Sequence, residues 1–152
     1  MTENGTRGPE TLLGWGPDKR ILAFNLQLVK RVVTKKLCDE NGARLTVVDP
    51  SHADLTLVEL VLRAMAGENL NEAALEASQA SGGKNDPFRG ELMVFCGFSS
   101  EDLDRFIQGY KVTGVPRVEL KAVLTQYNAD WTPVKLFEEL TKEKEAFDKQ
   151  NR

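Results

Sequence analysis

The residues whose types could do chemistry are most concentrated in Asn128-Ala129-Asp130-Trp131-Thr132, three residues after Thr125. Two hydroxyls, an amide and a carboxyl beside an indole ring could form a small polar pocket with an aromatic lid. The same residues can instead start a helix. Thr132 would accept hydrogen bonds from the first-turn N–H groups, and Trp131 would pack on Leu136 as a hydrophobic staple.

This segment has a counterpart earlier in the chain, His52-Ala53-Asp54-Leu55-Thr56, which shares its Ala, Asp and Thr. Both segments precede an apolar run with helical spacing. Staple-type pairs recur at three expected helix starts: Leu55 with Leu60, Phe98 with Leu103, and Trp131 with Leu136. Because the pattern repeats, helix capping is the favoured interpretation, and only the replacements of His52 by Asn128 and of Leu55 by Trp131 are left to explain.

Cys96 ends an apolar strand just before a helix that Ser99 is expected to cap. A helix N-terminus can lower the pKa of a thiol, so a small thiol-dependent enzyme using Cys96, with Ser99 or Thr125, is one alternative. No Cys-x-x-Cys motif accompanies it, and free cysteines are often buried. For Cys96 the structural role is therefore favoured, and Cys38 is expected to pack in the core.

His52 is the single histidine, and Asp49 and Asp54 lie close to it in sequence. It could act as a general base or a metal ligand, but one histidine with loosely spaced carboxylates is a weak metal pattern, and no metal site is expected. Gly82-Gly83-Lys84 lacks the spacing of a phosphate-binding loop. Dinucleotide and nucleophile-elbow motifs are also absent from the sequence, so no cofactor is expected.

Hydrophobic periodicity predicts strands over 20–24, 45–48, 91–96 and 118–124, each followed by a helix. The expected N-caps are Asn25, Thr56, Ser99 and Thr132, with Asp102 completing an approximate capping box at Ser99. Asn41-Gly42 ends the first helix. The charged stretch from Lys142 to Lys149 is expected to project or fray.

These elements predict a single α/β domain over 19–149, after an irregular tail over 1–18. The domain is expected to be a duplicated strand-helix-strand-helix unit, with repeats at 19–67 and 90–149 and a flexible linker at 68–89. Its four-stranded sheet, parallel or mixed, is expected to be covered by helices. Strands joined through a crossover helix should be parallel when they share a sheet.

The arrangement of the two units decides where a site could form. If all four strands are parallel, their C-terminal ends form one edge, the usual ligand site of open α/β sheets. That edge would gather Asn25, Asp49, His52, Cys96, Ser99, Thr125 and Asn128. If the units run antiparallel, the set splits in two. The candidate pocket residues are Cys96, Ser99, Thr125, Asn128, Trp131, His52 and Asp49.

The composition of the chain limits the classes of molecule that it is expected to bind. With a net charge of -3, the chain lacks the excess of basic residues that is typical of nucleic-acid binders. The cluster of Lys30, Arg31, Lys35 and Lys36 is expected on a solvated helix face. The opposite, core-facing side of that helix is expected to carry Leu28, Val29, Val32, Val33 and Leu37. With no signal peptide and no membrane-length apolar run in this sequence, a cytoplasmic protein with reduced cysteines and no membrane partner is expected.

Three short stretches carry a family resemblance: Phe95-Cys96-Gly97-Phe98-Ser99, Lys121-Ala122-Val123-Leu124-Thr125, and Asn128 with Trp131-Thr132. On these residues, the segment from about Glu91 to Glu139 resembles domain of unknown function 3783, a family of small uncharacterised bacterial proteins. The resemblance covers about a third of the chain, and the first unit matches poorly. Because the family has no established activity, the resemblance implies no catalytic residue.

The leading functional hypothesis is a non-catalytic ligand-binding or regulatory domain, because no catalytic triad, metal set or phosphate loop is found in the sequence. Its partner would be an unidentified small molecule or a protein. One alternative is the thiol enzyme based on Cys96. The other is a protein-protein interaction module, such as a homodimer formed through the sheet edge or the last helix.

Overall fold

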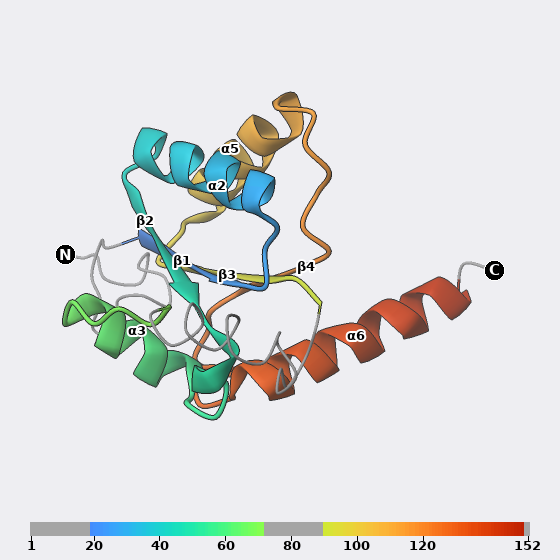
Figure 1. Ribbon diagram of the computed structural model, residues 1–152. Helices are drawn as coiled ribbons and strands as arrows, with labels where there is room; N and C mark the ends of the chain where they lie inside the picture. The colour runs from blue at the N-terminus through green and yellow to red at the C-terminus, as the bar shows by residue number, and fades with distance from the viewer. Residues whose placement is uncertain (1–18, 72–89, 151–152) are drawn as a thin grey trace, which may run out of the picture.

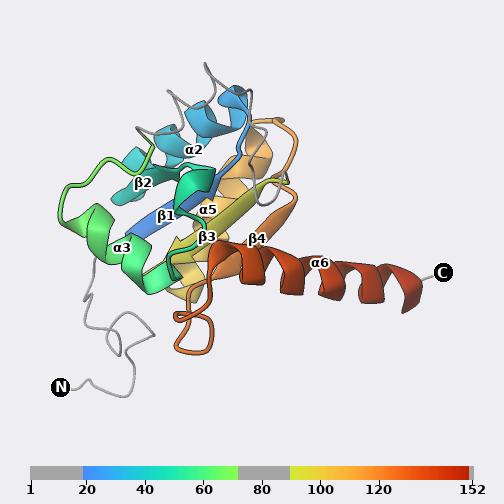
Figure 2. The same cartoon turned by 60° about the horizontal axis from the view of Figure 1, so that its bottom comes forward.

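The computed structural model describes residues 19–71 and 90–150. Within them, four strands and four helices alternate along the chain: β1 (Lys19–Phe24), α2 (Leu28–Glu40), β2 (Ala43–Val48), α3 (Leu57–Met65), β3 (Leu92–Cys96), α5 (Ser100–Val112), β4 (Leu120–Val123) and α6 (Pro133–Gln150). Helices α2 and α5 cover one face of the sheet, and α3 and α6 cover the other (Figures 1 and 2). The expected tail and most of the expected linker lie outside the described residues.

The sheet is mixed, with strand order β2-β1-β3-β4. Strand β1 is parallel to β2, and β3 is parallel to β4, but β1 and β3 are antiparallel, with Leu22 opposite Val94. The α/β class with a mixed four-stranded sheet is therefore confirmed. Each half runs strand-helix-strand-helix, while the origin of the halves by duplication stays a prediction.

Alternating side chains of the two central strands build a core on each face of the sheet. Leu22, Phe24 and Val94 pack toward α3 and α6, whereas Ile21 and Phe95 pack toward α2 and α5. Almost every residue of β1 and β3 is buried. This follows from their central positions, because a strand covered on both faces must be apolar throughout.

Helix α2 departs in part from the sequence-based expectation, since Leu37 is buried and Val33 packs against the core as expected, but the other three apolar residues are exposed. Leu28 and Val32, expected in the core, are 68% and 60% exposed, and Val29 is exposed as well. Lys30, expected on a solvated face, is buried. A long-range ion pair accounts for the burial of Lys30: its Nζ lies 2.7 Å from Oε1 of Glu91, the residue before β3. Lys35 and Lys36 are exposed, as expected.

Three of the expected helix caps are confirmed. Thr56 and Ser99 cap α3 and α5 in complete capping boxes, and Thr132 accepts from the backbone N–H of Lys135 at the start of α6. The fourth expectation was wrong. Gln27, without a side-chain cap, precedes α2, and Asn25 instead adopts a φ of 60° and donates through Nδ2 to the Gly90 carbonyl.

The two helix-entry segments meet beneath the sheet. The backbone N–H of Leu57 donates to the Trp131 carbonyl at 2.9 Å, and that of Val58 donates to Ala129 at 3.0 Å. The first turn of α3, whose N–H groups have no partners within the helix, is therefore satisfied by the segment that starts α6. Helix α6 then continues past the sheet (Figure 1) with an exposed, charged surface from Lys142 onward.

Candidate functional site

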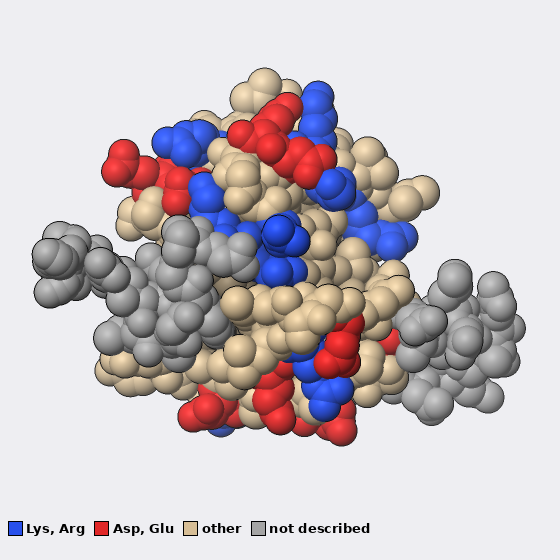
Figure 3. All heavy atoms as spheres, turned by 90° about the vertical axis from the view of Figure 1, so that its left-hand side faces the viewer, with Lys and Arg blue, Asp and Glu red and all other residues tan. Residues whose placement is uncertain are grey.

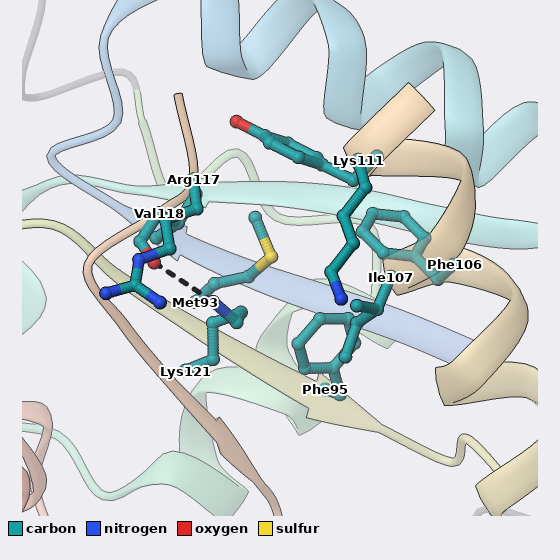
Figure 4. Close-up of a pocket in the computed structure, with 9 residues that line it drawn as sticks. Met93, Phe95, Phe106, Ile107, Lys111, Arg117, Val118 and Lys121 are labelled. Atoms are coloured by element: carbon teal, nitrogen blue, oxygen red, sulfur yellow. Dashed lines mark hydrogen bonds between the residues drawn. The ribbon is translucent and has the colours of Figure 1, made fainter. Parts of the chain in front are cut away.

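A cavity of about 120 Å³ lies between α5 and the β3–β4 side of the sheet (Figure 4). It lies at the edge of the sheet, because β4 is the last strand in the order and pairs only with β3 within the described residues. Nine side chains line it: Met93, Phe95, Phe106, Ile107, Tyr110, Lys111, Arg117, Val118 and Lys121. Six of them are apolar or aromatic, and three are basic.

The floor of the cavity is apolar and closely packed. Met93, Phe95 and Phe106 are almost completely buried. The rings of Phe95 and Phe106 meet edge to face, with centroids 5.4 Å apart, and Phe98 completes the aromatic cluster behind them. Such ring contacts add to the burial of apolar area and hold the rings in place. The floor is therefore a preformed surface.

The outer wall is the segment between α5 and β4, and three hydrogen bonds hold it. The Tyr110 hydroxyl donates to the Pro116 carbonyl at 3.0 Å. The Lys30 ammonium donates to the Arg117 carbonyl at 3.2 Å while paired with Glu91. At the mouth, Lys121 Nζ donates to the Val118 carbonyl at 3.0 Å. The wall is thus anchored to α5, α2 and β4.

The mouth of the cavity is basic. Figure 4 shows Arg117 and Lys121 on one side of Met93 and Lys111, from helix α5, on the other. Partial burial, followed by the charges of Arg117 and Lys111, lowers the pKa of Lys121. The nine lining residues include no acid. On the face in Figure 3, by contrast, acidic and basic side chains adjoin each other at the top and bottom.

The size of the cavity limits what can enter it. An apolar cavity of about 150 Å³ can bind a benzene molecule, and this one measures about 120 Å³. Whole ligands usually occupy larger pockets, of roughly 300–1,000 Å³. The cavity can therefore take one ring or a short alkyl group at most, and the rest of a ligand would lie at the basic mouth.

The candidate residues from the sequence lie elsewhere, and none of the seven lines this cavity. Because the two halves of the sheet run antiparallel, the set splits in two. Asp49 and His52 follow β2. At the opposite edge of the sheet, Cys96 is the last residue of β3, Ser99 follows β3, and Thr125 and Asn128 follow β4.

Thr125 and Asn128 form a local turn. The Asn128 side chain accepts from the Thr125 N–H at 2.9 Å and donates to the Val123 carbonyl at 3.1 Å. Thr125 Oγ1 accepts from the N–H groups of Tyr127 and Asn128. Their polar atoms therefore fold the chain between β4 and α6. Trp131, beyond this turn, packs on the core below the sheet, with Lys135 Nζ 4.9 Å from its ring centroid.

Cys96 is 1% exposed, and its side chain belongs to the core beneath the sheet, on the face opposite the cavity. Ser99 is occupied as the cap of α5, accepting from the Asp102 N–H at 3.0 Å. Cys38 is buried as expected, and burial, with the nearby charge of Asp39, raises its pKa to about 12. Both thiols are shielded from solvent.

Asp49 and His52 are neighbours, with His52 Nε2 3.8 Å from Asp49 Oδ2. Asp49 is buried, and its other carboxylate oxygen accepts from both the N–H and the hydroxyl of Ser51. The described residues hold no group of three or more potential metal ligands.

No helix within the described ranges is long and apolar enough to cross a membrane.

The sequence contained one signal for the cavity. Alternation along β4 places Lys121 and Val123 on the same face of the strand, and Val123 packs toward α5. A lysine is unusual on the face of a strand that packs toward a helix, and here Lys121 lines the cavity while the residue as a whole stays exposed. Its neighbours in the cavity come from β3, α5 and the wall segment, so their convergence could not be read from local sequence.

Comparison with known proteins gives a match for the segment of the chain that contains the cavity. Residues 91–147 match the model of a domain of unknown function, DUF3783. This match confirms the resemblance of the second half of the chain. All nine lining residues fall inside the matched segment. No curated protein and no solved structure matches the chain.

Proposed function

We propose that this protein is a ligand-binding domain whose ligand is a small amphipathic anion. The ligand would place a single ring or a short alkyl group in the cavity and an acidic group at its mouth. The observation that supports this most directly is the combination of an apolar floor of Met93, Phe95 and Phe106 with three basic residues and no acid in the lining.

Binding would relieve an unfavourable arrangement of charge. Lys111, Arg117 and Lys121 lie close enough for the first two to lower the pKa of the third. An anion between them would favour the charged form of Lys121, because opposite charges stabilise one another most where solvent is partly excluded. The apolar group would add stabilisation of about 25 cal/mol for each Å² removed from water.

The test is a titration of the full chain with 3-phenylpropionate, followed by amide chemical shifts. We expect saturable shifts at Met93, Phe106 and Lys121, and weaker binding at higher salt because the mouth is open to screening. 3-Phenylpropanol, which lacks the charge, is the matched ligand control. Equal affinity for the acid and the alcohol would contradict the proposal.

Single substitutions test whether binding of 3-phenylpropionate depends on the basic residues of the cavity. Replacing Arg117 with Gln should weaken binding of 3-phenylpropionate by about tenfold, corresponding to about 1.4 kcal/mol. Arg105→Gln is the matched control, because Arg105 is an exposed residue of α5 that pairs with Asp102 and does not line the cavity. Its affinity for 3-phenylpropionate should equal that of the unmodified chain.

A further inference from the structure

The amine of Lys121 occupies a position suited to covalent chemistry. It projects from β4 on the α5 side, and its side chain lines the same cavity as Met93 and Phe95 (Figure 4). Its Nζ is held 3.0 Å from the Val118 carbonyl oxygen. A carbonyl oxygen accepts from an ammonium or from a neutral amine, so this contact positions the nitrogen in either protonation state.

The surroundings of Lys121 lower the pKa of its ammonium and so raise the fraction of the neutral, nucleophilic amine. Partial burial of the ammonium is the larger cause, although the residue as a whole is exposed, and the positive charges of Arg117 and Lys111 add to it. No carboxylate among the lining residues compensates these charges. Lysines become nucleophiles in proteins by this combination of partial desolvation and a neighbouring cation.

We propose that Lys121 reversibly forms an imine with a 2-oxo acid that carries a single aromatic ring. This inference rests on the proposed function and deepens it by naming the chemical class of the ligand. The ring would occupy the apolar cavity, the carboxylate would meet Arg117, which lies on the same side of Met93 as Lys121, and the ketone would be presented to Lys121. All three parts of such a ligand then have a partner of matching chemistry.

The reaction needs no oxidant or reductant. Ammonium Lys121 first releases a proton to water, and the nitrogen lone pair attacks the ketone carbon, forming a C–N bond. The carbonyl electron pair moves to oxygen, which takes up a proton. The nitrogen then loses its second proton as the oxygen leaves as water, and the C=N bond forms. Addition of water reverses each step and returns the intact 2-oxo acid.

The experiment is reductive trapping of the full chain with phenylpyruvate and sodium cyanoborohydride. Reduction fixes the imine as a secondary amine, and the protein gains the mass of phenylpyruvate less one oxygen atom. Intact mass and peptide mapping should place most of the adduct on Lys121. Prior addition of 3-phenylpropionate, which lacks the ketone, should protect it. Labelling spread over many surface lysines, or concentrated on Lys111, would overturn the proposal.

Matched variants complete the test. Lys121→Arg retains the positive charge but cannot form an imine, so it should lose most of the trapped adduct. Lys135→Arg, at a lysine over Trp131 and outside the cavity, should be labelled like the unmodified chain. If 3-phenylpropionate binds and no adduct forms, the imine is excluded while the proposed function stands. If neither ligand binds, both fail.

Discussion

Lys30 and Glu91 form an ion pair with an Nζ–Oε1 distance of 2.7 Å, and both side chains are largely buried, at 9% and 15% exposed. The pair joins the first turn of α2 to the start of β3, across a separation of 61 residues. Glu91 also lies 3.4 Å from the backbone N–H of Gln27 at the start of α2. The pair thus fixes the rotation of α2 and, through the Arg117 carbonyl, the wall of the cavity.

Replacing one partner of this pair should therefore destabilise the protein strongly. Lys30→Met leaves the Glu91 carboxylate buried without its counterion, and we expect a loss of about 3 kcal/mol in the free energy of unfolding. Urea denaturation measures it. The matched control is Lys35→Met, which breaks the exposed Lys35–Asp39 pair and should cost less than about 1 kcal/mol. Equal losses would contradict the structural role of the buried pair.

The exposed apolar side of α2 gives a complementary prediction. Val32→Ser should change the free energy of unfolding by no more than about 0.5 kcal/mol, because this side chain already faces solvent. Leu37→Ala, on the buried side of the same helix, should cost about 2–5 kcal/mol. Thermal or urea denaturation distinguishes the two. A large loss from Val32→Ser would restore the helix orientation expected from sequence.

Gly90 is required by the close approach of an aromatic ring. A Cβ added there would lie 2.6 Å from Cζ of Phe137 in α6. Gly90→Ala should therefore overpack this contact and destabilise the protein by about 1–3 kcal/mol. The double variant with Phe137→Leu, which lacks the outer ring atoms, should lose less stability than the sum of the single changes. Strict additivity of the two in urea denaturation would argue against this contact.

The pKa of Cys38 predicts a dependence of stability on alkaline pH. Burial raises it from the reference value of 9.0 to about 12. Between these values the unfolded chain loses the thiol proton while the folded chain keeps it, so unfolding becomes more favourable as pH rises. The contribution is fully present below pH 9. Cys38→Ala should flatten the decline of unfolding free energy above that pH, and an unchanged slope would count against the shift.

Neighbouring residues in the sequence were enough to predict the helix starts, whereas the orientation of α2 and the strand pairing depend on residues far apart in the sequence. Each helix cap is built from residues within one turn, such as Ser99 with Asp102 and Thr132 with Pro133, so the capping pattern is visible in the sequence. The burial of Lys30 depends on Glu91, far along the chain. Apolar spacing on α2 therefore predicted the burial of Leu37 correctly but not the exposure of Leu28 and Val32. The antiparallel joining of β1 to β3 likewise has no local signature, and it decides which strand ends are neighbours.

Asn128 tests whether the entry segment of α6 has any role beyond folding. Its side chain satisfies the Thr125 N–H and the Val123 carbonyl, and Asn128→Ala leaves both without that partner. We expect a loss of about 1–3 kcal/mol in the free energy of unfolding, with no change in affinity for 3-phenylpropionate, because Asn128 does not line the cavity. Thr132→Ala, which removes only a cap, should cost about 1 kcal/mol and serves as the comparison. If Asn128→Ala abolished binding while the denaturation curve stayed in place, the functional site would lie at this turn instead of beneath α5.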